Sequence, residues 1–370
     1  MIVAILGGSN GSGAATAADL ALAGHRVRLW RAAVADVEAL GRPATLTLEA
    51  EGRRGKATLE LATSDMAAAL QGADVIVVAV PATSHDEIAQ QLGRHVSDRQ
   101  MVLLLPGTLG SLAIAQAITR VGGRLPAAIA ETGTRPHLAR ATGPAAVTAP
   151  VRAAHLPVGV FPASRAARTL ALIAEVFPAT RPCADVLDAA LTSAAPVLHP
   201  PVVLLNLGAI DRGPFDVHAS GATPTVGRLV DAVDAERVAT RRGWGYAAPH
   251  YEIATYHDEG RATEGLYGKG AWASIVASGL WKETLTLEHH YVREDAVLGL
   301  SLLESAARTA GVLTPAASGL LSLFGVLLGR DLSGRGRALE HLGLGDLTLR
   351  EIRALLVEGW TSPAWSRVTR

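Results

Sequence analysis

Residues 2–13, which read IVAILGGSNGSG, decide the fold of the N-terminal half. The unbroken apolar run Ile2–Leu6 ends in two glycines, and the alanine-rich stretch Ala14–Ala23 follows and stops at Gly24. A short apolar run closed by glycine predicts a buried strand, and an alanine-rich segment ending at glycine predicts a helix. The order strand, tight turn, helix is the opening unit of a dinucleotide-binding domain.

The glycine-rich turn lies where a pyrophosphate binds in such domains. Backbone N–H groups at the start of the helix, together with the helix dipole, bind phosphate oxygens, and small residues let the backbone approach them. A GxGxxG spacing counted from Gly7 puts Ser9 and Ser12 at the second and third small positions, so the fingerprint is degenerate. A glycine-rich loop without a ligand is the alternative. The predicted cofactor-binding residues here are Gly7, Gly8, Ser9, Asn10, Gly11 and Ser12, with Pro81 after a later strand.

The residue after the second predicted strand bears on the choice of cofactor. Domains that prefer NAD place an acidic residue there to bind the adenosine ribose. This chain has Trp30-Arg31 and no carboxylate before Asp36. Because an arginine pairs with a 2′-phosphate, we expect NADP(H), with NAD as the second option. The alternative is that Arg31 is a solvated surface residue.

Further apolar runs alternate with helical stretches along the first half. Val27–Trp30, Asp74–Val80 and Met101–Leu105 read as strands, which predicts a mostly parallel sheet covered on both faces. The alternating residues 45–61 predict an inserted antiparallel hairpin. Further strands are expected at 127–131, 145–148 and 157–161. We therefore expect an α/β Rossmann domain over residues 1–183 and an all-α domain over residues 184–370.

Composition limits the function classes. A chain of 370 residues with 49% hydrophobic positions is long enough for two domains, and its 34 basic and 34 acidic residues cancel. That balance argues against nucleic acid and membrane surfaces as partners. The single cysteine, Cys183, excludes an intrachain disulfide framework and favours the cytoplasm. The apolar stretch 313–328 is too short to span a membrane and predicts a buried helix. No metal site is expected, because His289 and His290 are adjacent and would diverge on a helix.

Several segments together resemble the opine dehydrogenases, the octopine and nopaline dehydrogenase family, over nearly the whole chain. The resemblance rests on the order of these segments: ILGGSNGSG, ADVIVVAVPATSH, LLLPGTLGS, AETGTRPHLAR, VLHPPVVLLNLG, TPTVGRLVDAVDAERV, EHHYVREDAVLGL and LLGRDLSGRGRALEHLGL. It implies an enzyme that reduces the imine of an amino acid or amine and a 2-oxo acid or other carbonyl. A nicotinamide supplies the hydride, and a secondary amine is formed.

The resemblance also implies a catalytic pair. A histidine in an HP-x-x-x-L-x-N segment matches His199, and an aspartate in an ED segment matches Asp295. Histidine suits proton donation near neutral pH, and a carboxylate on its far nitrogen would hold the tautomer. Asn206, seven residues on, is a candidate substrate contact. Without the family, His199 reads as a capping histidine before a helix starting at Pro200, Asp295 as a helix N-cap, and Asn206 as a satisfied buried amide.

The chain departs from the family pattern five residues before Asp295. Octopine-type members have an arginine there that grips the 2-oxo acid carboxylate, and this chain has His290. Histidine does not reproduce the planar fork of a guanidinium. Three explanations stay open. Arg293 binds the substrate carboxylate instead, the substrate lacks the carboxylate, or His290 becomes protonated at lower pH and then binds the carboxylate.

Two other functions stay open beside imine reduction. A 2-oxo acid or ketone reductase of a related two-domain type would rely on a lysine in the helical half, and none lies near His199. A non-catalytic dinucleotide-binding protein would explain the degenerate turn and the missing arginine. The expected partners are a small amine or amino acid and a carbonyl compound, with a homodimer as an open option.

Overall fold

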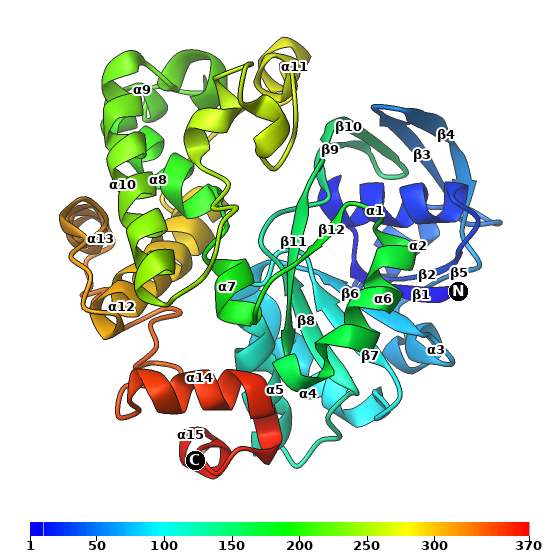
Figure 1. The fold of residues 1–370 in the computed structure, drawn as a ribbon. Coiled ribbons are helices and arrows are strands. Elements are labelled where there is room, and N and C mark those ends of the chain that lie inside the picture. The colour runs from blue at the N-terminus through cyan, green and yellow to red at the C-terminus, as the bar shows by residue number, and fades with distance from the viewer. Residues whose placement is uncertain (10, 370) are drawn as a thin grey trace. The chain divides into compact units, whose positions relative to one another are not determined.

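A computed structural model describes residues 1–9 and 11–369, so the predicted cofactor contact at Asn10 lies outside the described residues. The chain divides into two compact units, one of residues Met1–Val186 with Thr369 and one of residues Leu187–Val368 (Figure 1). The sequence placed the division three residues earlier, after Cys183.

The first unit contains an eight-stranded sheet in the order β12-β11-β8-β7-β6-β1-β2-β5. All neighbouring strands pair in parallel except β8 and β11. The central strands are apolar on both faces, which a sheet buried between two layers requires. The expected mostly parallel Rossmann sheet is therefore confirmed. Its strands are β1 (Ile2–Gly7), β2 (Arg26–Trp30), β5 (Leu61–Thr63), β6 (Val75–Ala79), β7 (Met101–Leu104), β8 (Ala128–Thr132), β11 (Leu156–Phe161) and β12 (Thr180–Pro182).

Helices connect these strands. The first follows β1 directly, so its N-terminus opens at the carboxyl edge of the sheet, where ligands bind in such folds. The helices are α1 (Gly11–Leu22), α2 (Val34–Glu38), α3 (Met66–Leu70), α4 (His85–His95), α5 (Gly110–Arg120) and α6 (Ala166–Val176).

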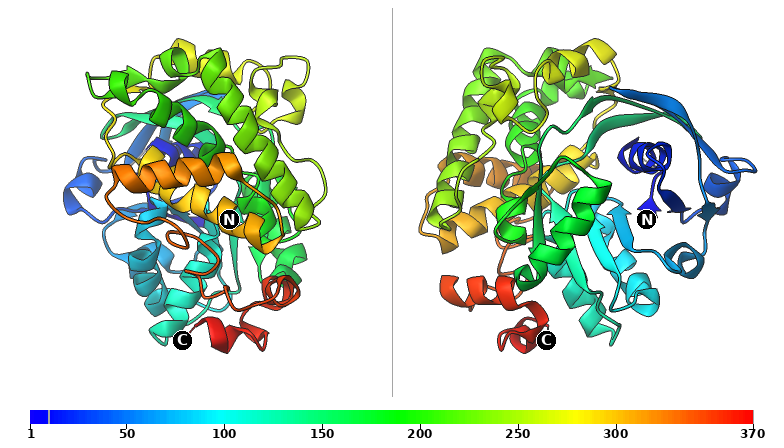
Figure 2. Two further views of the ribbon diagram at one scale, coloured as in Figure 1. Left: turned by 90° about the vertical axis from the view of Figure 1, so that its left-hand side faces the viewer. Right: turned by 45° about the vertical axis from the view of Figure 1, so that its right-hand side comes forward.

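A second sheet of four strands wraps around α1 (Figure 2, right). The expected hairpin is present as β3 (Thr45–Ala50) and β4 (Arg53–Thr58). It joins a second hairpin, β9 (His137–Gly143) and β10 (Ala146–Arg152), through parallel pairing of β3 with β10. This joining was not expected. As a result, residues 11–20 of α1 are buried along all sides.

The second unit is helical, as expected, apart from one two-stranded pair, β13 (Phe215–Asp216) with β14 (Lys282–Glu283). Two π-helices, which have i→i+5 hydrogen bonds, lie at η3 (Val217–Gly221) and η6 (Tyr291–Leu300). The α-helices are α7 (Val186–Ala190), α8 (Ala195–Leu205), α9 (Leu207–Ile210), α10 (Pro224–Gly243), α11 (Ala271–Ser278), α12 (Ser301–Thr309), α13 (Pro315–Leu327), α14 (Leu349–Glu358) and α15 (Trp365–Val368).

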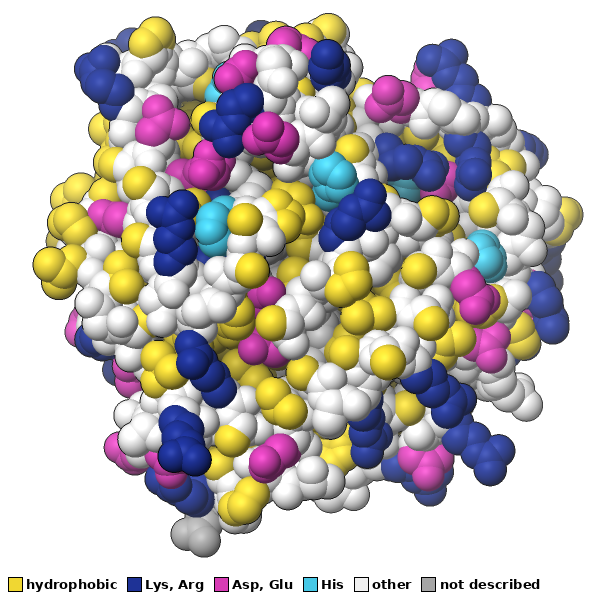
Figure 3. All heavy atoms as spheres, in the orientation of Figure 1, with side chains coloured by type: hydrophobic (Ala, Val, Ile, Leu, Met, Phe, Trp, Pro, Cys, Tyr) yellow, Lys and Arg dark blue, Asp and Glu magenta, His cyan; other side chains and the backbone are white. Residues whose placement is uncertain are grey.

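Two apolar segments lie in the helical half of the chain. The segment Val186–Leu205 has the length and hydropathy of a membrane span, but 78% of the apolar 18-residue stretch in it is buried inside the structure, as in the core helix of a globular protein. Helix α13, expected to be buried, has one apolar face in the core and one exposed, with Val326 78% exposed. Figure 3 shows hydrophobic side chains gathered over this helix, while basic and acidic side chains are interspersed on the face drawn.

Candidate active site

His199 lies inside helix α8, not before a helix start as its proline neighbours suggested. The helix begins at Ala195 and runs through Pro200 and Pro201. Each proline removes one helical hydrogen bond. The helix persists because seven of its eleven residues are buried, so packing outweighs the local preference. The expectation of a capping histidine is therefore wrong.

Asp295 lies in the π-helix η6, which packs against α8. The two helices approach closely at Gly299, where a Cβ would lie 2.3 Å from Cγ of Pro196. Gly299 is four residues after Asp295, and Pro196 is three residues before His199. The glycine therefore sets the separation of the two backbones beside the pair. Asp295 is inside a helix, so the alternative of a helix N-cap is also wrong.

The structure brings His199 and Asp295 into direct contact. Nδ1 of His199 lies 2.6 Å from Oδ2 of Asp295, and the two side chains are 16% and 14% exposed. A carboxylate accepting from Nδ1–H assigns proton exchange to the other nitrogen, Nε2, and stabilises the imidazolium. A histidine held by a carboxylate in this way can donate a proton from Nε2.

Aromatic rings surround this histidine. The ring of Tyr291, which is 2% exposed, stacks on His199 with 3.9 Å between centroids and 27° between planes. His218 meets the edge of His199 at 6.0 Å and lies against the rings of Trp272 and Trp281, at 5.4 and 5.9 Å. Tyr291 was not among the predicted site residues, although its position four residues before Asp295 on one helix was a usable signal.

His290 lies at the start of η6, with its ring 4.5 Å from that of Tyr291 and 4.1 Å from that of His289. The two adjacent histidines therefore lie together and do not diverge, because only His290 belongs to the helix end. Nε2 of His289 lies 3.6 Å from Oε1 of Glu283. Among the described residues, no group of three or more His, Cys, Asp or Glu side chains has the geometry to hold a metal.

Arg293 does not lie with Asp295. Its Nη1 lies 3.2 Å from Oε2 of the exposed Glu288, and its side chain is partly exposed. Residues two apart on a helix project from different sides, so Arg293 is directed away from the face that Asp295 uses. Arg293 is thus paired with Glu288 in this structure, and its role in place of the family's arginine stays a prediction.

Asn206 ends helix α8, and its side chain binds the main chain. Nδ2 donates to the carbonyl oxygens of Val202 and Gly221, at 2.7 and 3.2 Å. One amide hydrogen therefore binds back to α8, and the other connects the end of α8 with η3. Only Oδ1 remains for a substrate, and the alternative of a satisfied amide describes the observed contacts.

The turn after β1 packs so tightly that several of its positions accept only glycine. Gly7 and Gly8 have positive φ angles of 114° and 86°. A Cβ on Gly11 would lie 2.4 Å from the carbonyl oxygen of Ala139, and one on Gly13 would lie 2.8 Å from the Gly8 backbone. The positions that need glycine are thus 7, 8, 11 and 13, and each has it. Ser9 is exposed at the turn, Ser12 is buried, and Pro81 is exposed at the end of β6.

Arg31 lies in the wall of a pocket of about 90 Å³ beside this turn, together with Ser9, Asp36 and Pro144. It is 4% exposed, so the solvated alternative is wrong. Nη2 donates to the carbonyl oxygen of Gly8 at 2.6 Å, and Nη1 donates to those of Asp36 and Pro144 at 2.9 and 3.3 Å. Burial lowers the pKa of Arg31, and the charge of Asp36 raises it in part. The hydroxyl of Ser9 donates to Oδ2 of Asp36 at 2.9 Å, so Asp36 belongs to this pocket although it was not predicted there.

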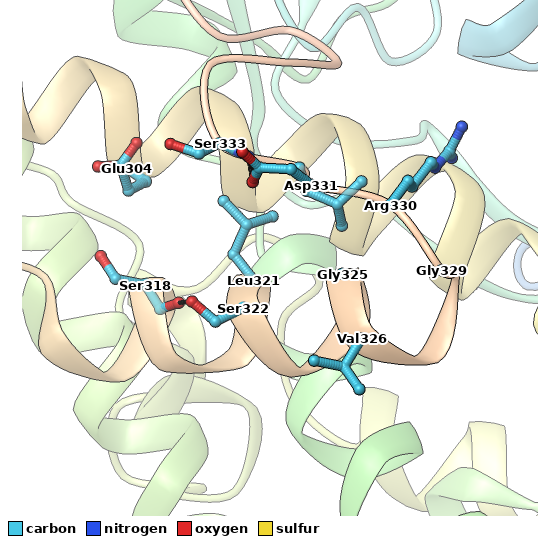
Figure 4. Close-up of a pocket in the computed structure, with 11 residues that line it drawn as sticks. Glu304, Ser318, Leu321, Ser322, Gly325, Val326, Gly329, Arg330, Asp331 and Ser333 are labelled. Atoms are coloured by element: carbon cyan, nitrogen blue, oxygen red, sulfur yellow. Dashed lines mark hydrogen bonds between the residues drawn. The ribbon is translucent and has the colours of Figure 1, made fainter.

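A separate pocket of about 530 Å³ lies in the helical unit (Figure 4). It contains none of the predicted site residues. The side chains that line it come from α12, α13 and the loop after α13, and include Glu304, Ser318, Leu321, Ser322, Arg330, Asp331 and Ser333.

Two family models match the chain. One described as NAD/NADP octopine/nopaline dehydrogenase, alpha-helical domain, matches residues 182–328, and one described as NAD-dependent glycerol-3-phosphate dehydrogenase N-terminus matches residues 2–121. Solved structures share the fold. Octopine dehydrogenase with NADH and agmatine has a TM-score of 0.69 at 18% identity, with 96% of this chain and 98% of that chain covered. Yersinopine dehydrogenase with NADP+ has a TM-score of 0.64 at 15% identity, with 98% of both chains covered.

The Rossmann unit and the helical unit with its histidine–aspartate pair define a two-domain oxidoreductase that uses a nicotinamide dinucleotide. The opine dehydrogenase of Arthrobacter sp. (strain 1C) is 32% identical over 356 residues, which is 95% of this chain and 97% of the relative. The chain belongs to the opine dehydrogenase family. It is an NAD(P)-dependent oxidoreductase of the CH–NH class, which joins an amino compound to a carbonyl compound by reduction.

Proposed function

We propose that His199 is the proton donor of this reductive condensation and that Asp295 orients it. The observation that carries the proposal is the 2.6 Å contact between Nδ1 of His199 and Oδ2 of Asp295. His199 protonates the hydroxyl that leaves as water when the imine forms, and Nε2 takes a proton back from the nitrogen of the resulting iminium. That proton is donated to the same nitrogen when hydride adds to the imine carbon, and solvent reprotonates His199 for the next turnover. Asp295 stays ionised and stabilises the imidazolium.

The cofactor would be held by backbone N–H groups at the turn after β1, with its adenosine ribose in the pocket of Arg31 and Asp36. When bound, a reduced nicotinamide supplies the hydride that adds to the imine carbon. The glycines at positions 7, 8, 11 and 13 support this placement, because a Cβ at any of them would meet backbone or the Leu29 side chain within 3 Å. The Arthrobacter relative is an opine dehydrogenase, and two relatives by fold were solved with NADH or NADP+.

The carbonyl substrate would be a 2-oxo acid whose carboxylate lies near His290. This residue replaces the family's arginine, and Arg293 is paired with Glu288. Octopine dehydrogenase was solved with pyruvate, which is such an acid. An imidazole binds a carboxylate firmly only when it is protonated. Binding of the oxo acid should therefore strengthen as the pH falls through the pKa of this histidine.

The experiment that tests the proton donor compares the wild type with His199→Ala and Asp295→Asn. We expect kcat to fall by about 10²–10⁴ for His199→Ala. The dissociation constant of the nicotinamide cofactor, measured by fluorescence, should not change. An unchanged kcat would refute the role of His199. The matched control is His341→Ala, which removes an exposed histidine from the loop before α14 and should keep full activity.

The alternatives are separated by the substrates required. Cofactor oxidation that needs both an amine and a carbonyl supports reductive condensation, whereas oxidation with the carbonyl alone supports a ketone reductase. Cofactor binding without turnover on any pair of substrates would support a non-catalytic protein. A cytoplasmic location and a homodimer stay predictions.

A further inference from the structure

The stack between Tyr291 and His199 joins two largely buried rings from different helices. Their centroids lie 3.9 Å apart and their planes are inclined by 27°. Tyr291 is at the first position of η6, and Asp295 is four residues later on the same helix. One helix therefore presents both a carboxylate and an aromatic face to the same imidazole.

The two contacts constrain different motions of the imidazole. A hydrogen bond from Nδ1 to Asp295 holds one atom of the ring, but the ring plane still rotates about that bond. The face of Tyr291 restricts this rotation, because turning the imidazole would force its edge into the phenol ring. The direction of Nε2, from which the proton leaves, is thus set by both residues. Proton transfer depends on this direction.

The stack also acts on the charge of the histidine. The face of an aromatic ring is electron-rich and attracts a cation lying over it. Tyr291 therefore stabilises the protonated imidazole relative to the neutral one, in addition to the effect of Asp295. The carboxylate of Asp295 and the ring of His218, which is nearly perpendicular to that of His199, lie beside His199, so both act on its charge without passing through Tyr291.

Other titratable groups contact Tyr291 itself. The rings of His289 and His290 lie 4.4 and 4.5 Å from its ring. Glu283 lies 3.6 Å from His289. Positive charge on the two histidines would oppose protonation of His199, and the carboxylate of Glu283 would offset part of that charge.

We propose that Tyr291 is a positioning residue of the reaction: its ring fixes the plane of His199 and favours the protonated form of the imidazole. This inference rests on the proposed role of His199 as the proton donor. It assigns a function to a side chain outside the proton-donating pair.

The experiment compares Tyr291→Phe, which keeps the ring, with Tyr291→Leu and Tyr291→Met, which remove it. For the two aliphatic variants we expect kcat to fall about tenfold, and the pH above which kcat declines to move down by about one unit. The sign follows from loss of a contact that favours the protonated donor. Tyr291→Phe should keep both values within about twofold and 0.3 pH units of the wild type.

Each possible result either supports or overturns the proposed role of Tyr291. An unmoved pH profile in a folded aliphatic variant, with the wild-type melting temperature, would overturn the proposal. If Tyr291→Phe lost as much as Tyr291→Leu, the hydroxyl would be responsible and the proposed role of the ring would be wrong. Two aliphatic variants, Tyr291→Leu and Tyr291→Met, are compared so that the experiment still gives a result if one of them does not fold. If His199→Ala kept its activity, the proposed function itself would fail, and that result does not involve Tyr291.

Discussion

Gly299 and Pro196 lie so close that no side chain larger than hydrogen fits between them. A Cβ on Gly299 would lie 2.3 Å from Cγ and 2.7 Å from Cβ of Pro196. We expect Gly299→Ala to push η6 and α8 apart and to lengthen the contact between His199 and Asp295. Because small displacements of catalytic groups are costly, kcat should fall about tenfold or more. Steady-state kinetics at saturating cofactor measure this.

The matched control for this glycine is Gly319→Ala. Gly319 lies on α13, and a Cβ there would meet no atom within 4 Å. This variant should keep its kcat and gain slightly in stability, because alanine favours helix more than glycine does. If the two variants had equal kcat, the close approach would not matter for catalysis.

If the adenosine ribose binds in the pocket of Arg31 and Asp36, as proposed, the charge of Asp36 would oppose a 2′-phosphate there. Its carboxylate accepts from Ser9 and so brings a negative charge beside the glycine-rich turn. We expect Asp36→Asn to raise kcat/KM for NADPH relative to that for NADH by about tenfold, which is the loss of roughly 1.4 kcal/mol of repulsion. Parallel assays with both cofactors measure the ratio. A ratio equal to that of the wild type would place the 2′ position elsewhere.

Arg31 should matter more for stability than for the choice of cofactor. Its guanidinium connects three main-chain carbonyls, those of Gly8, Asp36 and Pro144. Arg31→Gln removes these bonds from buried acceptors, which costs about 1–3 kcal/mol. The melting temperature should fall, and KM for NADPH and NADH should rise together. A selective rise in KM for NADPH at unchanged stability would instead support a direct bond to the 2′-phosphate.

The carboxylate of Asp19 makes stability depend on pH. It is buried between α1 and the second sheet, with Nη1 of Arg53 at 2.9 Å, Nε2 of His137 at 3.5 Å, and Arg152 also bound. Burial raises the pKa of Asp19, but the hydrogen bond from His137 and the charges of His137, Arg152 and Arg53 outweigh it and lower the pKa overall.

A lowered pKa in the folded state means that the ionised carboxylate stabilises the fold. This contribution is complete above the unfolded pKa of about 4 and is lost as the pH falls through the folded value. At pH 7, Asp19→Asn should therefore lower the melting temperature by about 4–10 °C. Thermal unfolding at a series of pH values should show the gap closing below about pH 4. A gap independent of pH would mean that the charge is not responsible.

His290→Arg should restore a permanent charge at the position where the family has arginine. We expect KM for a 2-oxo acid to fall about tenfold at pH 8 and to lose its dependence on pH, because arginine stays protonated. The KM for the amine should not change. A ketone without a carboxylate is the control substrate, and its KM should be the same in both proteins. Equal effects on oxo acid and ketone would contradict a carboxylate contact.

The fold of the first unit was largely predictable because its signals are local. Apolar runs ending in glycine or proline predicted β1, β6 and β7, and alternating residues predicted the hairpin of β3 and β4. The joining of this hairpin to β10 was not predictable. Thr47 pairs with Ala146, almost a hundred residues later, and no local pattern records such a pairing.

The site was predictable only in part, for a similar reason. His199 and Asp295 came from the resemblance to a family, and their contact agrees with it. Burial of Arg31 depends on neighbours from other segments, and so does the bond from Asn206 to the carbonyl oxygen of Gly221. The pairing of Arg293 with Glu288 is local, but no pattern in the sequence indicated it. The two prolines after His199 led to a wrong prediction. Proline favours the start of a helix, whereas packing here continues the helix through both prolines.

The second sheet makes the proposed ribose pocket, which contains Arg31 and Asp36, a composite of distant segments. Its walls come from the turn after β1, from α2, from β3 and from the turn between β9 and β10. In that last turn the carbonyl oxygen of Pro144 accepts a hydrogen bond from Arg31. In a nucleotide-binding domain without such a second sheet, changing the cofactor preference requires substitutions only in the loop after the second strand. Here such a redesign has to vary residues 141–146 together with residues 31–36, so a combinatorial library over both segments is the sensible starting point.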